Sequence, residues 1–65
     1  MREHVKREVA IEIISMMIAF AAEDNNQEEI NRLNKEKDMI YLGDETIIEK
    51  SYNEYSKIIK KRMEK

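Results

Sequence analysis

The residues best suited to chemistry at the start of the chain are His4, Glu8 and Glu12, which recur at every fourth position. This spacing places all three on one stripe of a helix, because side chains four residues apart are neighbours there. Imidazole and carboxylate groups are transition-metal ligands, and a second copy of the chain could complete their coordination shell. The chain has one histidine and no cysteine, however, which disfavours a metal site. We therefore expect no metal, no other cofactor and a solvated polar edge at this stripe.

Other polar residues favour structural roles. Ser15 lies in the most apolar part of the sequence, but a lone histidine gives no sign of a nucleophile and base pair. We interpret Ser15 as a small residue that lets another helix approach closely. Asp24, Glu28 and Glu29 lack the oxygen spacing and the glycine of a calcium loop, and acids in this position are typical of a helix N-terminus. We expect that the protein is not an enzyme.

One short segment offers an enzymatic alternative. Residues 33–38 read "LNKEKD", and Glu36 and Asp38 match the last Glu and Asp of the sequence Ser-Gln-Glu-Leu-Asp. The segment distantly resembles that signature, which belongs to small sporulation-control phosphatases that act on aspartyl-phosphate response regulators. Three other positions depart from it, namely Asn34, Lys35 and Lys37. The resemblance implies a phosphatase-like regulator with Asp38 as its critical acid, and this is a minor alternative.

The composition predicts one all-α domain, residues 1–65. The chain has no proline, a single glycine and many strong helix formers. A chain of this length barely has enough core to fold, and no disulfide can assist it. The lack of cysteine also suggests a reducing compartment, so we expect a cytoplasmic protein.

Two turns divide the chain into a helical hairpin and a third helix. The first helix includes residues 5–22, and the turn "EDNNQEE" follows it, with Asn25 suited to a left-handed conformation. Asn26 with Glu29 predicts a capping box for the second helix. The second turn, "YLGDET", has a glycine suited to a helix end, and either Asp44 or Thr46 is expected to cap the third helix. Thr46 with Glu49 is a further capping-box match.

The first helix carries two apolar faces. Residues 9–22 would span only about 21 Å as a helix, which is too short to cross a membrane of roughly 30 Å, and Glu12 interrupts the run. We expect no membrane association. One face has the spacing of a core stripe and consists of Val5, Val9, Ile13, Met16, Met17 and Phe20. The second consists of Ile11, Ile14, Ile18, Ala21 and Ala22.

A simple three-helix bundle needs only one stripe from each helix. We therefore predict that self-association, with a dimer favoured, or a larger partner protein covers the extra face and completes the bundle. The predicted interface residues are Ile11, Ile14, Met17, Ile18, Phe20 and Ala21. The alternative is that the first helix is central and the other two helices cover both faces within one chain.

Charge is distributed unevenly along the chain although its net value is only −2. Residues 23–54 hold ten acids against four bases, whereas residues 55–65 hold five bases against one acid. A basic C-terminal segment suggests nucleic-acid binding as an alternative function, and its candidate contacts are Lys57, Lys60, Lys61 and Arg62. The acids Asp44 and Glu45 at the start of the third helix disfavour that alternative. The main prediction is thus a non-catalytic interaction module, a homo-oligomeric regulator or accessory protein.

Overall fold

The structure, a computed structural model, describes the backbone of residues 2–64 and the side chains of residues 5–64. Its elements are α1 (Arg2–Glu23), α2 (Gln27–Tyr41), α3 (Glu45–Lys50), the π-helical segment η1 (Ser51–Tyr55) and α4 (Ser56–Glu64). Residues 2–64 contain no strand. The predicted all-α class is therefore confirmed, with a hairpin followed by a third helix.

Local side-chain chemistry explains both turns. Asn25 has a φ of 57°, and the Asn26 side chain accepts a hydrogen bond of 3.2 Å from the backbone N–H of Glu29. At the second turn Gly43 has a φ of 89°, which a residue without Cβ adopts at little cost. Asp44 then caps α3 by accepting hydrogen bonds from two backbone N–H groups. Of the two predicted caps Asp44 is therefore correct, and Thr46 lies inside the helix.

The third helix is continuous but widens in its middle. The backbone N–H of Ser56 bonds the carbonyl of Ser51, five residues back, which defines the π turn. The Ser56 hydroxyl donates to the carbonyl of Tyr52 and so satisfies an acceptor in the widened segment. The helix expected in one piece is thus α3, η1 and α4 in succession.

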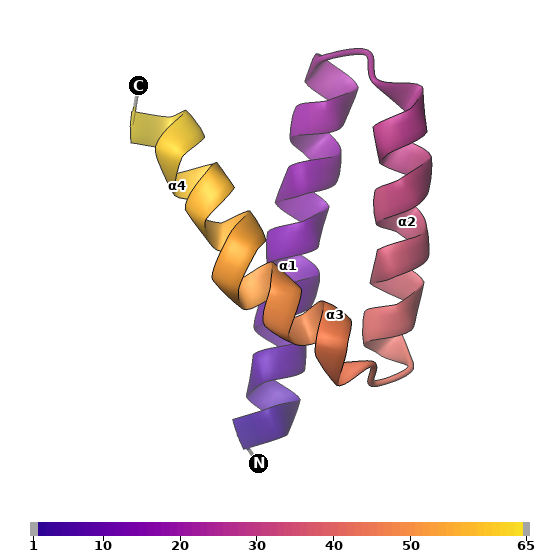
Figure 1. The fold of residues 1–65 in the computed structure, drawn as a ribbon, viewed down its shortest axis with the longest axis vertical. Helices are drawn as coiled ribbons and strands as arrows, with labels where there is room; N and C mark the ends of the chain where they lie inside the picture. The colour runs from indigo at the N-terminus through magenta and orange to yellow at the C-terminus, as the bar shows by residue number, and fades with distance from the viewer. Residues whose placement is uncertain (1, 65) are drawn as a thin grey trace.

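Helix α1 is the centre of the molecule. In Figure 1, α1 and α2 lie side by side as an antiparallel pair, and the third helix crosses α1 diagonally. Every other element contacts α1. The Cα positions extend over 35 × 25 × 14 Å, so the molecule is a slab about two helices thick.

The core lies between the three helices of one chain. Ile14, Leu33 and Ile40 are completely buried, and burial of each such side chain stabilises the fold by about 1.5–3 kcal/mol. The buried apolar set is Ala10, Ile14, Met17, Ala21, Leu33, Ile40, Ile48, Tyr55 and Ile59.

This core corrects half of the predicted interface. Ile14, Met17 and Ala21 are buried against other residues of the same chain, which leaves them no surface for a partner. Ile11, Ile18 and Phe20 are half-buried and pack against the core from its edge. The reason is that α2 and the third helix both dock on α1, as the central-helix alternative described.

Candidate functional site

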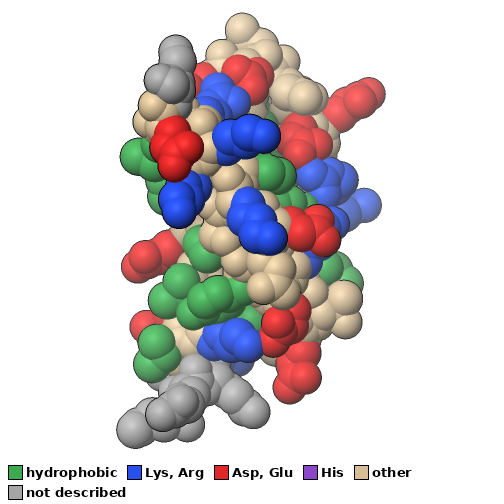
Figure 2. Space-filling view, turned by 60° about the vertical axis from the view of Figure 1, so that its left-hand side comes forward, with side chains coloured by type: hydrophobic (Ala, Val, Ile, Leu, Met, Phe, Trp, Pro, Cys, Tyr) green, Lys and Arg blue, Asp and Glu red, His purple; other side chains and the backbone are tan. Residues whose placement is uncertain are grey.

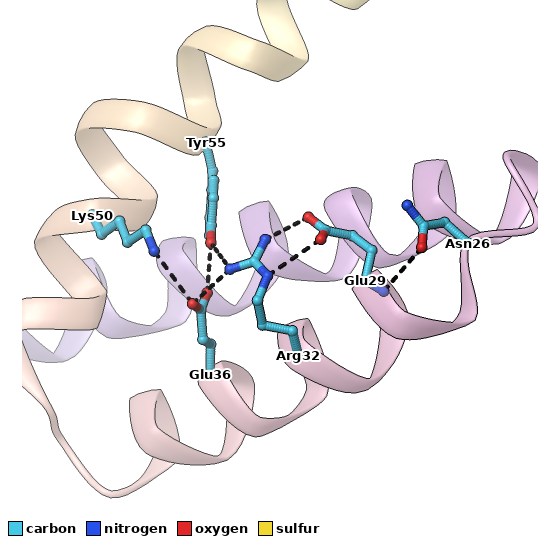
Figure 3. Close-up of polar contacts among 6 residues, drawn as sticks. All are labelled: Asn26, Glu29, Arg32, Glu36, Lys50 and Tyr55. Atoms are coloured by element: carbon cyan, nitrogen blue, oxygen red, sulfur yellow. Dashed lines mark hydrogen bonds and ion pairs between the residues drawn. The ribbon is translucent and has the colours of Figure 1, made fainter.

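The most elaborate polar arrangement is a cluster centred on Glu36, which is only 9% exposed (Figure 3). Its carboxylate accepts hydrogen bonds from the Tyr55 hydroxyl at 2.6 Å and from Arg32 Nη1 at 2.9 Å. Lys50 Nζ lies 3.3 Å from the same carboxylate. These donors come from α2, α3 and η1, so the cluster ties the third helix to α2. Sequence analysis missed it.

The charges of the cluster balance, because Arg32 and Lys50 pair with Glu29 and Glu36. Arg32 also donates to Glu29 through two nitrogens, and this hydrogen bonding lowers the pKa of the Glu29 carboxyl. Burial raises the pKa of Tyr55, and its hydrogen bond to Glu36 raises it further. Because the Glu36 carboxylate already has three donors, it is a structural acceptor and not an exposed acid awaiting a substrate.

The phosphatase-like resemblance does not coincide with this cluster. Asp38 is exposed, whereas Glu36 is buried. Two residues along a helix correspond to a rotation of roughly 200°, so the two acids lie on opposite sides of α2. A shallow groove near the end of α2 is lined by Met39, Leu42, Gly43 and Asp44. It contains neither Glu36 nor Asp38.

The structure finds no metal or membrane site in the part of the chain it describes. Among the described side chains, no three histidine, cysteine or acidic groups lie close enough to hold a metal ion. The side chain of His4 lies outside the described residues. No helix in residues 2–64 is long and apolar enough to cross a membrane.

An apolar stripe runs along the outside of α1. We define the outer α1 stripe as Val5, Val9, Met16 and Phe20. Val5 is 55% exposed and Met16 is 39% exposed, while the other two are half-buried. Figure 2 shows hydrophobic side chains gathered on the lower part of this face, with acidic side chains on both sides of them and basic side chains nearby.

This stripe belongs to the face that sequence analysis assigned to the core. The spacing of Val5, Val9, Met16 and Phe20 was correctly recognised as one face of a helix, but its direction was not. The two faces of α1 have similar composition, and the interhelical contacts decide which one is enclosed. The contacts between the helices therefore determine which valine and methionine side chains are exposed.

The C-terminal helix borders the stripe. The Arg62 guanidinium lies 4.5 Å from the centre of the Phe20 ring and pairs with Asp24 at 3.1 Å. This hydrogen bonding lowers the pKa of Asp24. Ile58 stands one turn before Arg62 on the same side of α4 and is 47% exposed. Helix α4 thus extends the apolar surface of the outer α1 stripe.

The structure separates the four basic residues predicted to contact nucleic acid. Lys57, Lys60 and Lys61 are exposed on α4. Arg62 instead faces α1, where it pairs with Asp24 and with Glu23 at 3.6 Å. Three lysines thus remain of the predicted basic surface, and exposed acids, Glu54 and Glu64, flank them along the chain.

Comparison of the chain with protein families, curated proteins and solved structures gives no match.

Proposed function

We propose that the protein is a small helical module for protein–protein interaction and that it binds through the outer α1 stripe. The observation that carries this proposal is the exposure of Val5 and Met16 on a helix whose other face already fills the core. Contiguous apolar patches larger than roughly a few hundred Å² are rare on monomeric proteins and often mark interaction sites. The role that we propose for this binding is that of a regulator or accessory protein.

Two further features support the proposal. Methionine adapts its shape to a partner more readily than branched side chains do, and Met16 lies in the middle of the stripe. The Glu36 cluster holds α2 and the third helix in place, so the stripe is presented on a fixed support. We also propose the cytoplasm as the compartment, because the chain contains no cysteine.

Site-specific photo-crosslinking in the cells that produce the protein tests this function. A photoreactive phenylalanine analogue replaces Met16 in one variant and Asn34, an exposed residue of α2, in the control. We expect light-dependent adducts with protein from position 16 and none from position 34. Adducts of equal yield from both positions, or none from either, would contradict the proposal.

A further inference from the structure

We propose that a second copy of this chain covers the outer α1 stripe, with the two-fold axis running along α1. In this arrangement α1 of each copy faces α4 of the other. The inference depends on the proposed function, because it names the partner of the same surface. It follows in three steps from the relative direction of the helices, the apolar surface they share and the charges on either side.

The first step is that the third helix, although it crosses α1 diagonally, runs from the same end of the molecule toward the same end as α1 (Figure 1). Lys6, near the start of α1, pairs with Glu49 of α3 at 2.5 Å and lies 5.5 Å from the Tyr52 ring. At the far end, Arg62 of α4 reaches Phe20 and Asp24. The N-terminal part of α1 therefore contacts the N-terminal part of the third helix, and the C-terminal end of α1 lies near the C-terminal part of the third helix.

The second step is that the two helices present one apolar strip. Met16 precedes Phe20 by one turn, and Ile58 precedes Arg62 by one turn. Because Arg62 stacks on Phe20, Ile58 lies on the side of α4 nearest the outer α1 stripe. A two-fold axis along the helices places the α1 stripe of one copy on Ile58 of the other.

The third step is the charge on each side of this strip. Exposed Glu8 and Glu12 border the stripe on α1, and exposed Lys57 and Lys61 border Ile58 on α4. A two-fold axis along the helices brings the acidic border of each copy to the basic border of the other. An axis across the helices would bring acid to acid and base to base. The charges therefore favour the first arrangement.

The size of the surface suits such a pair. A specific interface of standard size buries about 800 Å² on each partner, and the whole chain exposes 4886 Å². The dimer would thus cover roughly one sixth of each copy. The broad face of the slab, 35 × 25 Å between Cα positions, is large enough for this.

Charge exchange between two variants tests the arrangement. One variant carries Glu12→Lys and the other carries Lys57→Glu with Lys61→Glu. All three positions are exposed, so circular dichroism should show both variants folded. In sedimentation velocity over a concentration series, we expect a wild-type dimer and a dissociation constant roughly tenfold higher for each variant alone. An equimolar mixture should form a mixed dimer more tightly than either variant pairs with itself.

One acid provides a test with the opposite sign. Glu54 is exposed one turn before Ile58, on the otherwise basic border. Glu54→Lys should therefore tighten the dimer several-fold. As matched controls on α2, Asp38→Lys and Lys35→Glu change exposed charges far from the stripe, and their mixture should show no preference for the mixed dimer.

Each other outcome overturns the inference. A monomer at all concentrations removes the second copy as partner, and a dimer unaffected by the charge changes uses another surface. A preference for mixed dimers between Glu12→Lys and wild type alone would indicate an axis across the helices. If the wild type is monomeric while position 16 still crosslinks a different protein, the proposed function stands and only the second copy is rejected.

Discussion

At the scale of single residues, Glu36 is the side chain that most clearly connects sequence to architecture. A buried carboxylate is costly unless its oxygens have donors, and three donors from two helices converge on this one. Burial therefore makes the position of the third helix depend on a few hydrogen bonds. The consequences are measurable with small substitutions.

Glu36→Ala should lower the free energy of unfolding by about 1–3 kcal/mol, because the Tyr55 hydroxyl and Arg32 lose their common acceptor. Glu36→Gln keeps an acceptor oxygen and should cost less. Urea unfolding followed by circular dichroism gives both values. Lys35→Ala, an exposed position on α2 away from the outer α1 stripe, serves as the control, for which a change within about 0.5 kcal/mol is expected. Equal stability of Glu36→Ala and wild type would show that the cluster does not hold the helix.

Tyr55 should make stability sensitive to alkaline pH. Its folded-state pKa is raised above the ordinary value of about 10 by burial and by Glu36. The protonated phenol is therefore favoured by folding, and its contribution is complete below pH of about 10 and declines as pH rises through the folded-state pKa. An absorbance titration of the three tyrosines should show a late phase that Tyr55→Phe removes. If the late phase persists in the Tyr55→Phe variant, it belongs to another tyrosine.

At the scale of elements, the sequence predicted helices and turns well because their signals are local. Asn25, Asn26 and Gly43 act on the backbone within three residues as expected, and Asp44 was one of the two caps considered for the third helix. Only the Asn26 half of the predicted capping box is present, because the Asn26 N–H bonds the Ala21 carbonyl and the Glu29 carboxylate pairs with Arg32. The π turn at Ser51–Tyr55 has no comparable signal in the sequence. Local helix propensity therefore does not specify the π turn.

The candidate surface was predicted less well for the same reason. Periodicity identified both apolar faces of α1, but it could not tell which one the other helices would cover. The Glu36 cluster was missed because Arg32 and Tyr55 are 23 positions apart. The spacing of Glu29, Arg32 and Glu36 on α2 was the available signal, and it marks a charged stripe without naming its partner.

Two serines near the π turn should have opposite effects on stability. The Ser51 hydroxyl is buried and has no hydrogen-bond partner among the described residues, so Ser51→Ala should raise the free energy of unfolding by about 1 kcal/mol. The Ser56 hydroxyl bonds the Tyr52 carbonyl, so Ser56→Ala should lower it. Thermal unfolding of the two single variants measures the contrast. A loss of stability in Ser51→Ala would mean that its hydroxyl has a role in the widened segment.

At the scale of the whole molecule, a slab two helices thick has a large surface for its volume. Among the described residues its core consists of nine apolar side chains, and a chain of this size is marginally stable by itself. Association would therefore contribute to folding as well as to function. The free energy of binding then adds to the free energy of unfolding.

The thermal midpoint should accordingly rise with protein concentration, because a dimer unfolds to two free chains. Met16→Glu places a charge in the centre of the stripe and should remove this dependence, while its midpoint at low concentration stays near that of the wild type. Differential scanning calorimetry over a concentration series measures both. A wild-type midpoint independent of concentration would argue against a folding contribution from association.

The pairs that bracket the third helix, Lys6 with Glu49 and Arg62 with Asp24, are exposed to water. Dissolved ions screen such pairs, but they screen the buried Glu36 carboxylate, which is only 9% exposed, much less. Concentrated salt therefore acts unequally on the molecule: it loosens the two ends of this helix while its middle stays anchored. The ionic strength of the surroundings would in this way set how firmly the basic border of the apolar strip is held against α1.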